Sequence, residues 1–443
     1  MQKNNPKITN AWCFYDWANS VYSLVITSTI FPIYYSAVAT NPETNATIVN
    51  FLGFELESSV LFSYAVSAAF LIIALLSPFL TSIADYSGRK KLFMQLFCYL
   101  GSLSCIGLFF FTRDTFTLSV ILFVLASIGF SGSIVFYNAY LPEIATEDQF
   151  DKLSARGFSM GYIGSVLLLI FNLAMILEPE WFGIAADNKS LPPRIAFLTT
   201  GLWWFGFAQY SFYYLPGNVY NRKPKGSWVL NGLKELQKVW KQVQELPMLK
   251  RYLLAYFFYN MGVQTVMYVA TIFGIEELKL ADSALIVTIL IIQLVAIAGA
   301  YAFAFLSGKF GNIRALIVAV IIWIGICIGA YFIRSEVDFY VLAAIVGSVM
   351  GGVQSLSRST YSKLIPATTI DHASFFSFYD VTEKVSIVLG TLAYGLVAQL
   401  TGSMRNSILA LIVFFVLGLI FLSMVRWKKA IGAEHGVKAN VAI

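Results

Sequence analysis

Twelve apolar runs, each long enough to cross a lipid bilayer, divide this chain of 443 residues. A helix needs about 20 apolar residues to span the hydrocarbon core. In lipid every backbone N–H and C=O group must be paired within the protein, and these runs are too long for barrel strands, so we expect twelve transmembrane helices. They lie near 14–39, 58–83, 92–112, 116–141, 157–177, 194–215, 251–274, 283–307, 314–333, 339–361, 375–400 and 407–427.

Composition supports an all-α membrane protein. Hydrophobic residues make up 58% of the chain and charged residues 12%, whereas a soluble domain carries about 25% charged residues. The four cysteines lie in or beside apolar runs, and no Cys/His cluster has metal-ligand spacing. We therefore expect neither a bound metal nor a cofactor.

The basic residues predict the orientation in the membrane. If the N-terminus is cytoplasmic, 23 of the 30 Lys and Arg residues lie on that side and six on the other. Positive charge is retained on the cytoplasmic side of membranes. We therefore expect both termini in the cytoplasm, and the net charge of +6 needs no nucleic-acid partner to explain it.

The two halves of the chain repeat one another. The segment YNAYLPEI at 137–144 aligns with TYSKLIPA, which begins at Thr360, at an offset of 224 between tyrosines and between prolines. Parallel six-helix repeats occur in secondary transporters. We expect an N-terminal six-helix bundle at 1–215, a cytoplasmic amphipathic linker at 216–250 and a C-terminal six-helix bundle with a short basic tail at 251–443.

The linker carries apolar residues at near-helical spacing among lysines, namely Trp228, Leu233, Leu236 and Trp240. This pattern predicts an amphipathic helix lying on an anionic membrane surface. Membrane lipids are therefore expected partners, and binding of another protein is the alternative.

Polar residues share one face of the first and fourth helix of each half, because residues three or four apart lie on the same side of a helix. These four helices are expected to line something polar. The positions are Asp16, Asn19, Ser20, Ser23 and Thr27; Ser127, Ser131 and Asn138; Asn260, Gln264 and Thr271; and Gly347, Gly351, Gln354, Arg358 and Tyr361.

The eleventh run is the most charged, with Asp380, Glu383 and Lys384 together. A charge at the bilayer centre costs about 2.5–3.5 kcal/mol, so these side chains should face the bundle interior. Asp380 and Lys384 are four residues apart and can pair, whereas Glu383 points about 100 degrees away from Lys384 and needs another partner. Arg358 is the first candidate. The alternative is a buried ion-pair network without ligand contact.

Several motifs carry a family resemblance. TSIADYSGRKK resembles the loop signature of the major facilitator superfamily, keeping Asp85, Gly88 and Arg89 but not the family's residues at Thr81 and Tyr86. More specific are YDWANS, YNAYLPEI, YNMGVQTV, GGVQSLSRS and FFSFYDVTEK, which look like the vacuole effluxer family of that superfamily. The resemblance covers eleven spans and implies the major facilitator fold. Its eukaryotic members are linked to autophagy and amino-acid export.

The resemblance also suggests a gate on the cytoplasmic side. An acid at the end of the second helix can hold a neighbouring helix end. We expect gating roles for Asp85, Gly88, Arg89 and Asp380. Where the family often has an acid in YNDGVQT, this chain has Met261, so a proton-coupling role for that acid does not carry over.

These features together predict a secondary transporter of a small polar solute, with an amino acid as the expected cargo, exported by rocking of the two halves. A zwitterion needs one cationic and one anionic contact. Coupling to protons would use Asp16 or Glu383. The expected substrate-binding residues are Tyr15, Asp16, Asn19, Asn138, Tyr259, Asn260, Gln264, Gln354, Arg358, Tyr379 and Lys384.

The sequence leaves three alternative functions. The 38 Phe and 24 Tyr residues suggest an exporter of lipids or amphiphiles, although interfacial aromatic belts explain them too. A sensor that binds without transport is the second. An enzyme is disfavoured, since the chain has only His372 and His435 and no GxSxG or HExxH motif. The short loops and tails favour a bacterial inner (plasma) membrane over a vacuolar one, and we expect a monomer.

Overall fold

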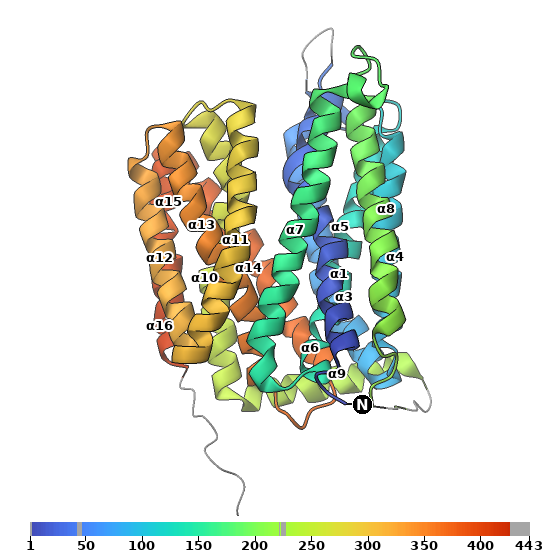
Figure 1. Ribbon diagram of the computed structural model, residues 1–443, viewed down its shortest axis with the longest axis vertical. Coiled ribbons are helices and arrows are strands. Elements are labelled where there is room, and N and C mark those ends of the chain that lie inside the picture. The colour runs from blue at the N-terminus through green and yellow to red at the C-terminus, as the bar shows by residue number, and fades with distance from the viewer. Residues whose placement is uncertain (1, 42–46, 221, 223–226, 426–443) are drawn as a thin grey trace, which may run out of the picture.

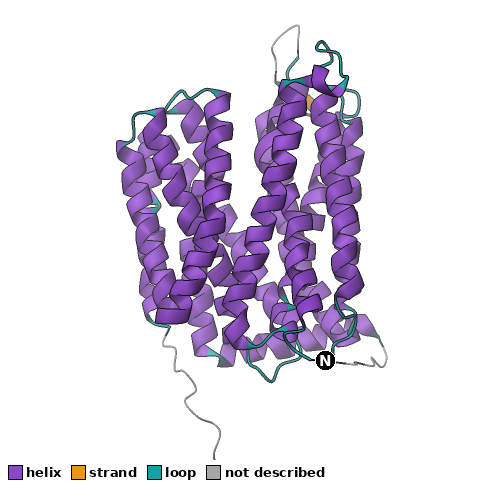
Figure 2. Ribbon diagram, viewed as in Figure 1, coloured by secondary structure: helices purple, strands orange, loops and turns teal. Residues whose placement is uncertain are grey.

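The computed structural model describes residues 2–41, 47–220, 222 and 227–425. Long helices stand side by side in two bundles (Figure 1), and nearly all of the described chain is helical (Figure 2). The predicted basic tail after Val425, His435 and part of the predicted linker lie outside the described residues.

The first bundle contains the helices of the N-terminal half, on the right in Figure 1. Its first span changes from α-helix to a π-helical segment, η1, and back. Its long elements are α1 (Pro6–Val21), η1 (Tyr22–Ile30) and α2 (Phe31–Ala39), followed by α3 (Ser58–Ser87), α4 (Lys90–Gly107), α5 (Phe116–Asn138), α7 (Phe150–Leu177) and α8 (Leu191–Tyr214).

Short elements cap this bundle at both ends. A two-stranded antiparallel hairpin pairs β1 (Ile48–Phe51) with β2 (Phe54–Glu57). The remaining short helices are η2 (Leu108–Phe110), α6 (Leu141–Ile144), η3 (Glu147–Gln149) and η4 (Pro179–Phe182).

The second bundle contains the helices of the C-terminal half, on the left in Figure 1. Its last span is broken at Leu411 into two helices. The elements are α10 (Pro247–Glu276), α11 (Asp282–Phe310), α12 (Asn312–Phe332), α13 (Glu336–Leu364), α14 (His372–Thr401), α15 (Met404–Ala410) and α16 (Ile412–Ser423).

The helix between the bundles, α9 (Trp228–Glu245), crosses beneath them at the end where the chain begins. We call this end the linker face and the end that carries the β1–β2 hairpin the loop face (Figure 1). The structure differs in part from the predicted membrane-surface helix. Val239 and Val243 are buried against the bundles, and the Trp240 ring lies 5.5 Å from that of Phe378 in α14. Leu230 and Leu233 stay exposed.

Ten of the twelve predicted spans coincide with helical segments long and apolar enough to cross a membrane. The other two, 194–215 and 251–274, coincide with α8 and α10, which are long but less apolar. Several helices also run past the apolar runs; α7, for example, begins at Phe150 rather than near 157. Such polar turns extend the helices beyond the hydrocarbon layer.

Within the second bundle, helices pack closely through small residues, as expected where lipid supplies no hydrophobic driving force between helices. The prediction that Gly347 and Gly351 belong to a polar face is wrong. A Cβ on Gly347 would lie 2.5 Å from the Ile292 carbonyl oxygen. A Cβ on Gly351 would overlap the carbonyl oxygen of Ala296. Both glycines therefore let the backbones of α13 and α11 approach closely.

This packing predicts that Gly351→Ala lowers the melting temperature of the purified protein by about 1–3 °C, since overpacking against backbone costs about 1–3 kcal/mol. Gly325→Ala in α12 is the matched control. No heavy atom lies within 4 Å of the Cβ it would add, so improved helix propensity should leave stability equal or higher. Equal melting temperatures for the two variants would contradict the packing argument.

Candidate functional site

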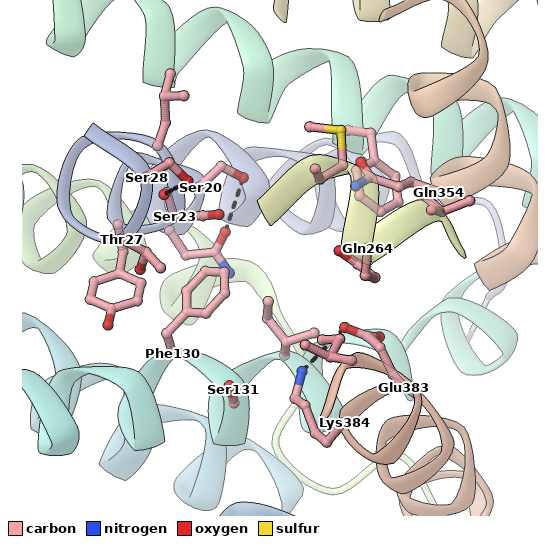
Figure 3. A pocket seen from close by; sticks show the side chains of 18 of the residues that line it. Ser20, Ser23, Thr27, Ser28, Phe130, Ser131, Gln264, Gln354, Glu383 and Lys384 are labelled. Carbon is pink, nitrogen blue, oxygen red and sulfur yellow. Dashed lines mark hydrogen bonds and ion pairs between the residues drawn. The ribbon is translucent and has the colours of Figure 1, made fainter. Parts of the chain in front are cut away.

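A polar cavity of about 280 Å³ lies between the two bundles. Its wall combines residues of α1, η1, α3, α5 and α7 with residues of α10, α11, α13 and α14. Small-molecule sites start at about 300 Å³, so the cavity suits a compact ligand. Figure 3 shows hydroxyl-bearing side chains around Ser20 and Ser23 facing Gln264, Glu383 and Lys384 of the other bundle.

Nine of the eleven predicted substrate-binding residues lie in this wall. They come from both bundles, so any ligand in the cavity would touch both. The nine are Asp16, Asn19, Asn138, Asn260, Gln264, Gln354, Arg358, Tyr379 and Lys384, and Glu383, a predicted proton carrier, joins them.

Tyr15 and Tyr259 do not lie in the wall. Both are fully buried behind it; the Tyr15 ring packs 5.2 Å from Tyr137, and the Tyr259 hydroxyl hydrogen-bonds with that of Ser357 at 2.8 Å. Each adjoins a wall residue in sequence and therefore points about 100 degrees away from it on the helix. A substrate-binding role for either tyrosine is not supported by this geometry.

The π-helical segment η1 changes which residues of the first span face the cavity. Ser20, Ser23 and Thr27 line it as the α-helical spacing predicted, and Ser28 lines it too. The Ser28 hydroxyl donates to the Ser23 carbonyl oxygen at 2.9 Å, five residues back. A π turn therefore brings Ser28 onto the wall, which the α-helical period did not indicate.

A buried ion pair joins the bundles at the edge of the cavity nearest the linker face. The Arg358 guanidinium of α13 lies 3.3 Å from the Asp16 carboxylate of α1. The Tyr137 hydroxyl donates to the same carboxylate oxygen at 2.7 Å. Arg358 also donates from Nε to the Ser154 hydroxyl and from Nη2 to the Ser154 carbonyl oxygen, both at 2.9 Å.

Aromatic rings enclose the same guanidinium. Its central carbon lies 4.2 Å from the ring centre of Phe158, 4.7 Å from that of Trp12 and 5.4 Å from that of Tyr137. Gly157 of α7 completes the enclosure, because a Cβ there would overlap the Asp16 carboxylate. A residue of one bundle is therefore held by a pocket made wholly by the other.

The predicted pairing of Glu383 with Arg358 is wrong, because Asp16 holds Arg358. Glu383 instead accepts from the Tyr256 hydroxyl at 3.2 Å and lies 3.2 Å from the Lys384 ammonium. The long side chain of Lys384 bends back toward Glu383. The angle of about 100 degrees between successive helix positions therefore did not predict this contact. The predicted Asp380–Lys384 pair is confirmed at 3.5 Å. Asp380 is buried and lies off the cavity wall.

Asp85, at the end of α3, binds the start of α14 in the other bundle. Its carboxylate accepts from the Ser374 backbone N–H at 2.7 Å, the Ser374 hydroxyl at 2.8 Å and the Ala373 N–H at 3.3 Å. A carboxylate at a helix N-terminus is favoured by unpaired N–H groups and by the helix dipole. Asp85 thus acts as a cap supplied from the opposite bundle.

Gly88 ends α3 in the left-handed conformation, with φ of 68°. A side chain there would also meet Asn218 at 2.6 Å. Arg89 is the N-cap residue of α4. The gating roles of Gly88, Arg89 and Asp380 remain predictions.

A second contact of this kind, missed from the sequence, centres on Asp151 in the first turn of α7. Its carboxylate accepts from Lys363 at 2.6 Å, Asn312 at 2.8 Å and the Ser307 hydroxyl at 2.9 Å, all in the second bundle. An acid in a polar turn looks like an ordinary loop residue, so no local signal marked it.

The linker adds a third contact on the same face. Asp371, in the turn before α14, forms ion pairs with Arg222 and with Lys238, the latter at 3.0 Å. Burial alone would raise the pKa of Asp371, but hydrogen bonds with Glu235, Arg222 and Lys238 outweigh it and hold that pKa below its usual value. Burial and the neighbouring Asp371 raise the pKa of Glu235.

A line of contacts between the bundles follows α7 from the linker face to the cavity. We call it the ladder; it consists of Asp151, Ser154, Phe158 and Tyr162 with their partners in the second bundle. Asp151, Ser154 and Phe158 follow one another by successive turns, and beyond them the Tyr162 hydroxyl donates to Gln354 at 2.6 Å. These contacts join the two bundles between the cavity and the linker face.

Comparison with known proteins gives consistent matches along the chain. Residues 4–435 match the family model described as vacuole effluxer Atg22 like. The chain is 34% identical over 428 residues to the uncharacterized MFS-type transporter YxiO of Bacillus subtilis (strain 168), covering 96% of each chain. It is 23% identical to autophagy-related protein 22-2 of Aspergillus niger, covering 89% of this chain and 79% of that one.

A solved structure shares the fold. The major facilitator superfamily transporter FucP, in its outward conformation, superposes with a TM-score of 0.68 over 96% of this chain and 99% of its own, at 13% identity. The predicted major facilitator fold is confirmed.

The ladder predicts that Asp151→Ala shifts the protein toward a conformation open on the linker face. The change leaves Lys363 without its carboxylate, and breaking such a buried pair costs about 3 kcal/mol, enough to alter a two-state ratio about a hundredfold. Spin labels on cysteines replacing Lys152 and Lys309, both exposed, would report the distance between α7 and α11. The four native cysteines are buried.

Asp148→Ala is the control, since Asp148 is exposed and its carboxylate accepts from the side chain of its neighbour Gln149, within the same bundle. An unchanged distance distribution in Asp151→Ala would show that this contact does not hold the face closed.

Proposed function

Because the chain belongs to the Atg22-like vacuole effluxer family of the major facilitator superfamily, we propose that it exports a small polar solute, an amino acid, by alternating access. It is an integral, multi-pass membrane transporter and not an enzyme. The observation that carries the proposal is the cavity between the bundles, with charged side chains in its wall and inter-bundle contacts between it and the linker face.

The cavity wall supports an amino acid better than a lipid. It offers carboxylate, ammonium and amide groups from both bundles, at Glu383, Lys384 and Asn260 among others. A zwitterion can satisfy such groups, whereas an acyl chain would leave them desolvated and unpaired. Export of a lipid or amphiphile, and ligand sensing without transport, are the less favoured alternatives.

Rocking of the bundles would supply alternating access. The closing contacts join side chains of different bundles, and each can be broken without unfolding a helix. When the linker face opens, Asp85 releases α14, Asp151 releases Lys363 and Arg358 parts from Asp16. Rigid-body motion of two halves around a midplane site suits this arrangement.

Proton coupling would use Asp16 and Glu383. Both are carboxylates inside the membrane, both line the cavity and both have a cationic partner that motion of the bundles or a ligand can remove. A carboxylate that loses its cation in a dry site binds a proton instead. The proton would then travel with the conformational change.

We infer that the linker face is cytoplasmic, in accord with the 23 basic residues that the predicted topology assigns to the cytoplasmic side. The Bacillus relative supports a bacterial plasma membrane. We propose a monomer, since one chain supplies both walls of the cavity.

Proteoliposome flux tests the proposal. Purified protein should be stabilised against heat by an amino acid found in a screen of amino acids, nucleosides, sugars and lipids, and should carry that compound across a vesicle membrane. A ligand that stabilises without measurable flux would favour a sensor, and a lipid hit with lipid flux would favour the amphiphile alternative.

We predict that Asp16→Asn and Glu383→Gln each reduce pH-gradient-driven flux of that solute to less than about a tenth of the wild-type rate. Asp114→Asn, an exposed loop carboxylate, is the control and should keep the rate. If both membrane variants retain full gradient-driven flux, the assignment of proton coupling to these carboxylates is wrong.

A further inference from the structure

The pocket that holds Arg358 is complete without Arg358. We call it the cation cage: Trp12, Asp16, Tyr137, Ser154 and Phe158, all in the first bundle. Arg358 reaches it from α13 in the second bundle. The cage is therefore a binding site of one bundle whose present occupant belongs to the other.

The cage has the chemistry of a guanidinium site. Ring centres of Phe158 and Trp12 lie 4.2 Å and 4.7 Å from the guanidinium carbon, and the N–H groups donate to Asp16 and to two oxygens of Ser154. A guanidinium is planar, is weakly hydrated and stacks on aromatic faces, whereas an ammonium is a compact, strongly hydrated point charge. The site therefore prefers guanidinium to ammonium.

Opening of the linker face would empty the cage, because Arg358 moves with the second bundle. Asp16, whose side chain is 7% exposed in the closed form, would then lose its counter-ion. A buried carboxylate without a partner is strongly unfavourable. A cation arriving from the linker side would restore the pairing.

We propose that the cage binds the guanidinium group of the transported solute when the linker face is open, and that Arg358 displaces it when that face closes. This rests on the proposed transport function and names its substrate class: arginine and related guanidino compounds. Displacement by a tethered copy of the same group releases the solute into the cavity on the loop side, which is the direction of export.

Groups next to the cage suit the rest of such a solute. Asn19, one helical turn from Asp16, lines the cavity, and its buried side-chain NH₂ has no hydrogen-bond partner among the described residues. The Ser165 hydroxyl of α7 shares both properties. These groups can donate hydrogen bonds to the carboxylate of an amino acid whose guanidinium occupies the cage.

Flux kinetics test the substrate class. We expect Phe158→Leu to raise KM for L-arginine about tenfold in counterflow and KM for L-lysine less than about twofold, because a lost ring face weakens a stacked planar cation more. Phe62→Leu is the matched control. Phe62 does not line the cavity or touch the cage; it stacks on Phe31 and on the back of the wall residue Phe123, so the arginine-to-lysine ratio should stay unchanged.

An emptied cage gives a second, independent readout. Arg358→Ala should melt at lower temperature than wild type, and millimolar methylguanidinium should raise that temperature by about 3 °C or more, whereas methylammonium and urea should not. The Asp16→Asn/Arg358→Ala double variant should lose the response. An Arg358→Ala protein that methylguanidinium does not stabilise would overturn the cage assignment.

Flux measurements on the wild type distinguish the substrate class from the transport function itself. Wild-type flux of neutral amino acids with no preference for guanidino compounds would overturn this inference and leave the proposed function intact. Absence of flux for every amino acid, arginine included, would overturn the proposed function and the substrate class together.

Discussion

The contact between the two bundles depends on one buried ion pair, between Asp16 and Arg358. Both groups are almost fully buried in a membrane protein, where an unpaired charge is costly. Each therefore needs the other, together with the hydroxyl of Tyr137 and the two oxygens of Ser154. Since the partners belong to different bundles, the pair is stable only while the bundles touch on the linker side. The stability of this ion pair is therefore coupled to closure of the linker face.

The outer contacts extend this coupling to the linker face. Asp85 caps α14 from the opposite bundle, and Asp151 gathers three donors of α11, α12 and α13. None of these bonds holds a helix together internally, so all of them can break while both bundles stay folded. The cavity then gains access to the linker side at the cost of these contacts and of the Asp16–Arg358 pair, which a bound solute or a proton on Asp16 can offset.

Much of this arrangement could be predicted from the sequence, and the limits are physical. Helical spacing placed Asp16, Asn19 and Gln264 on the cavity wall, because one period decides which face a residue occupies. Tyr15 and Tyr259 were misplaced by proximity in a motif, although neighbours in sequence point about 100 degrees apart. Asp151 and Gly157 could not be found, since the partners described above lie well over a hundred residues away along the chain. The partner of Glu383 depended on how a flexible lysine folds back.

A structure of the Asp85→Ala/Asp151→Ala double variant would test the central claim most directly. With two linker-face contacts removed, the account predicts a conformation open on that face, in which Arg358 has left the ring faces of Trp12 and Phe158 and Asp16 faces the opened side. A linker-face-open structure in which Arg358 still sits in the cage against Asp16 would contradict it.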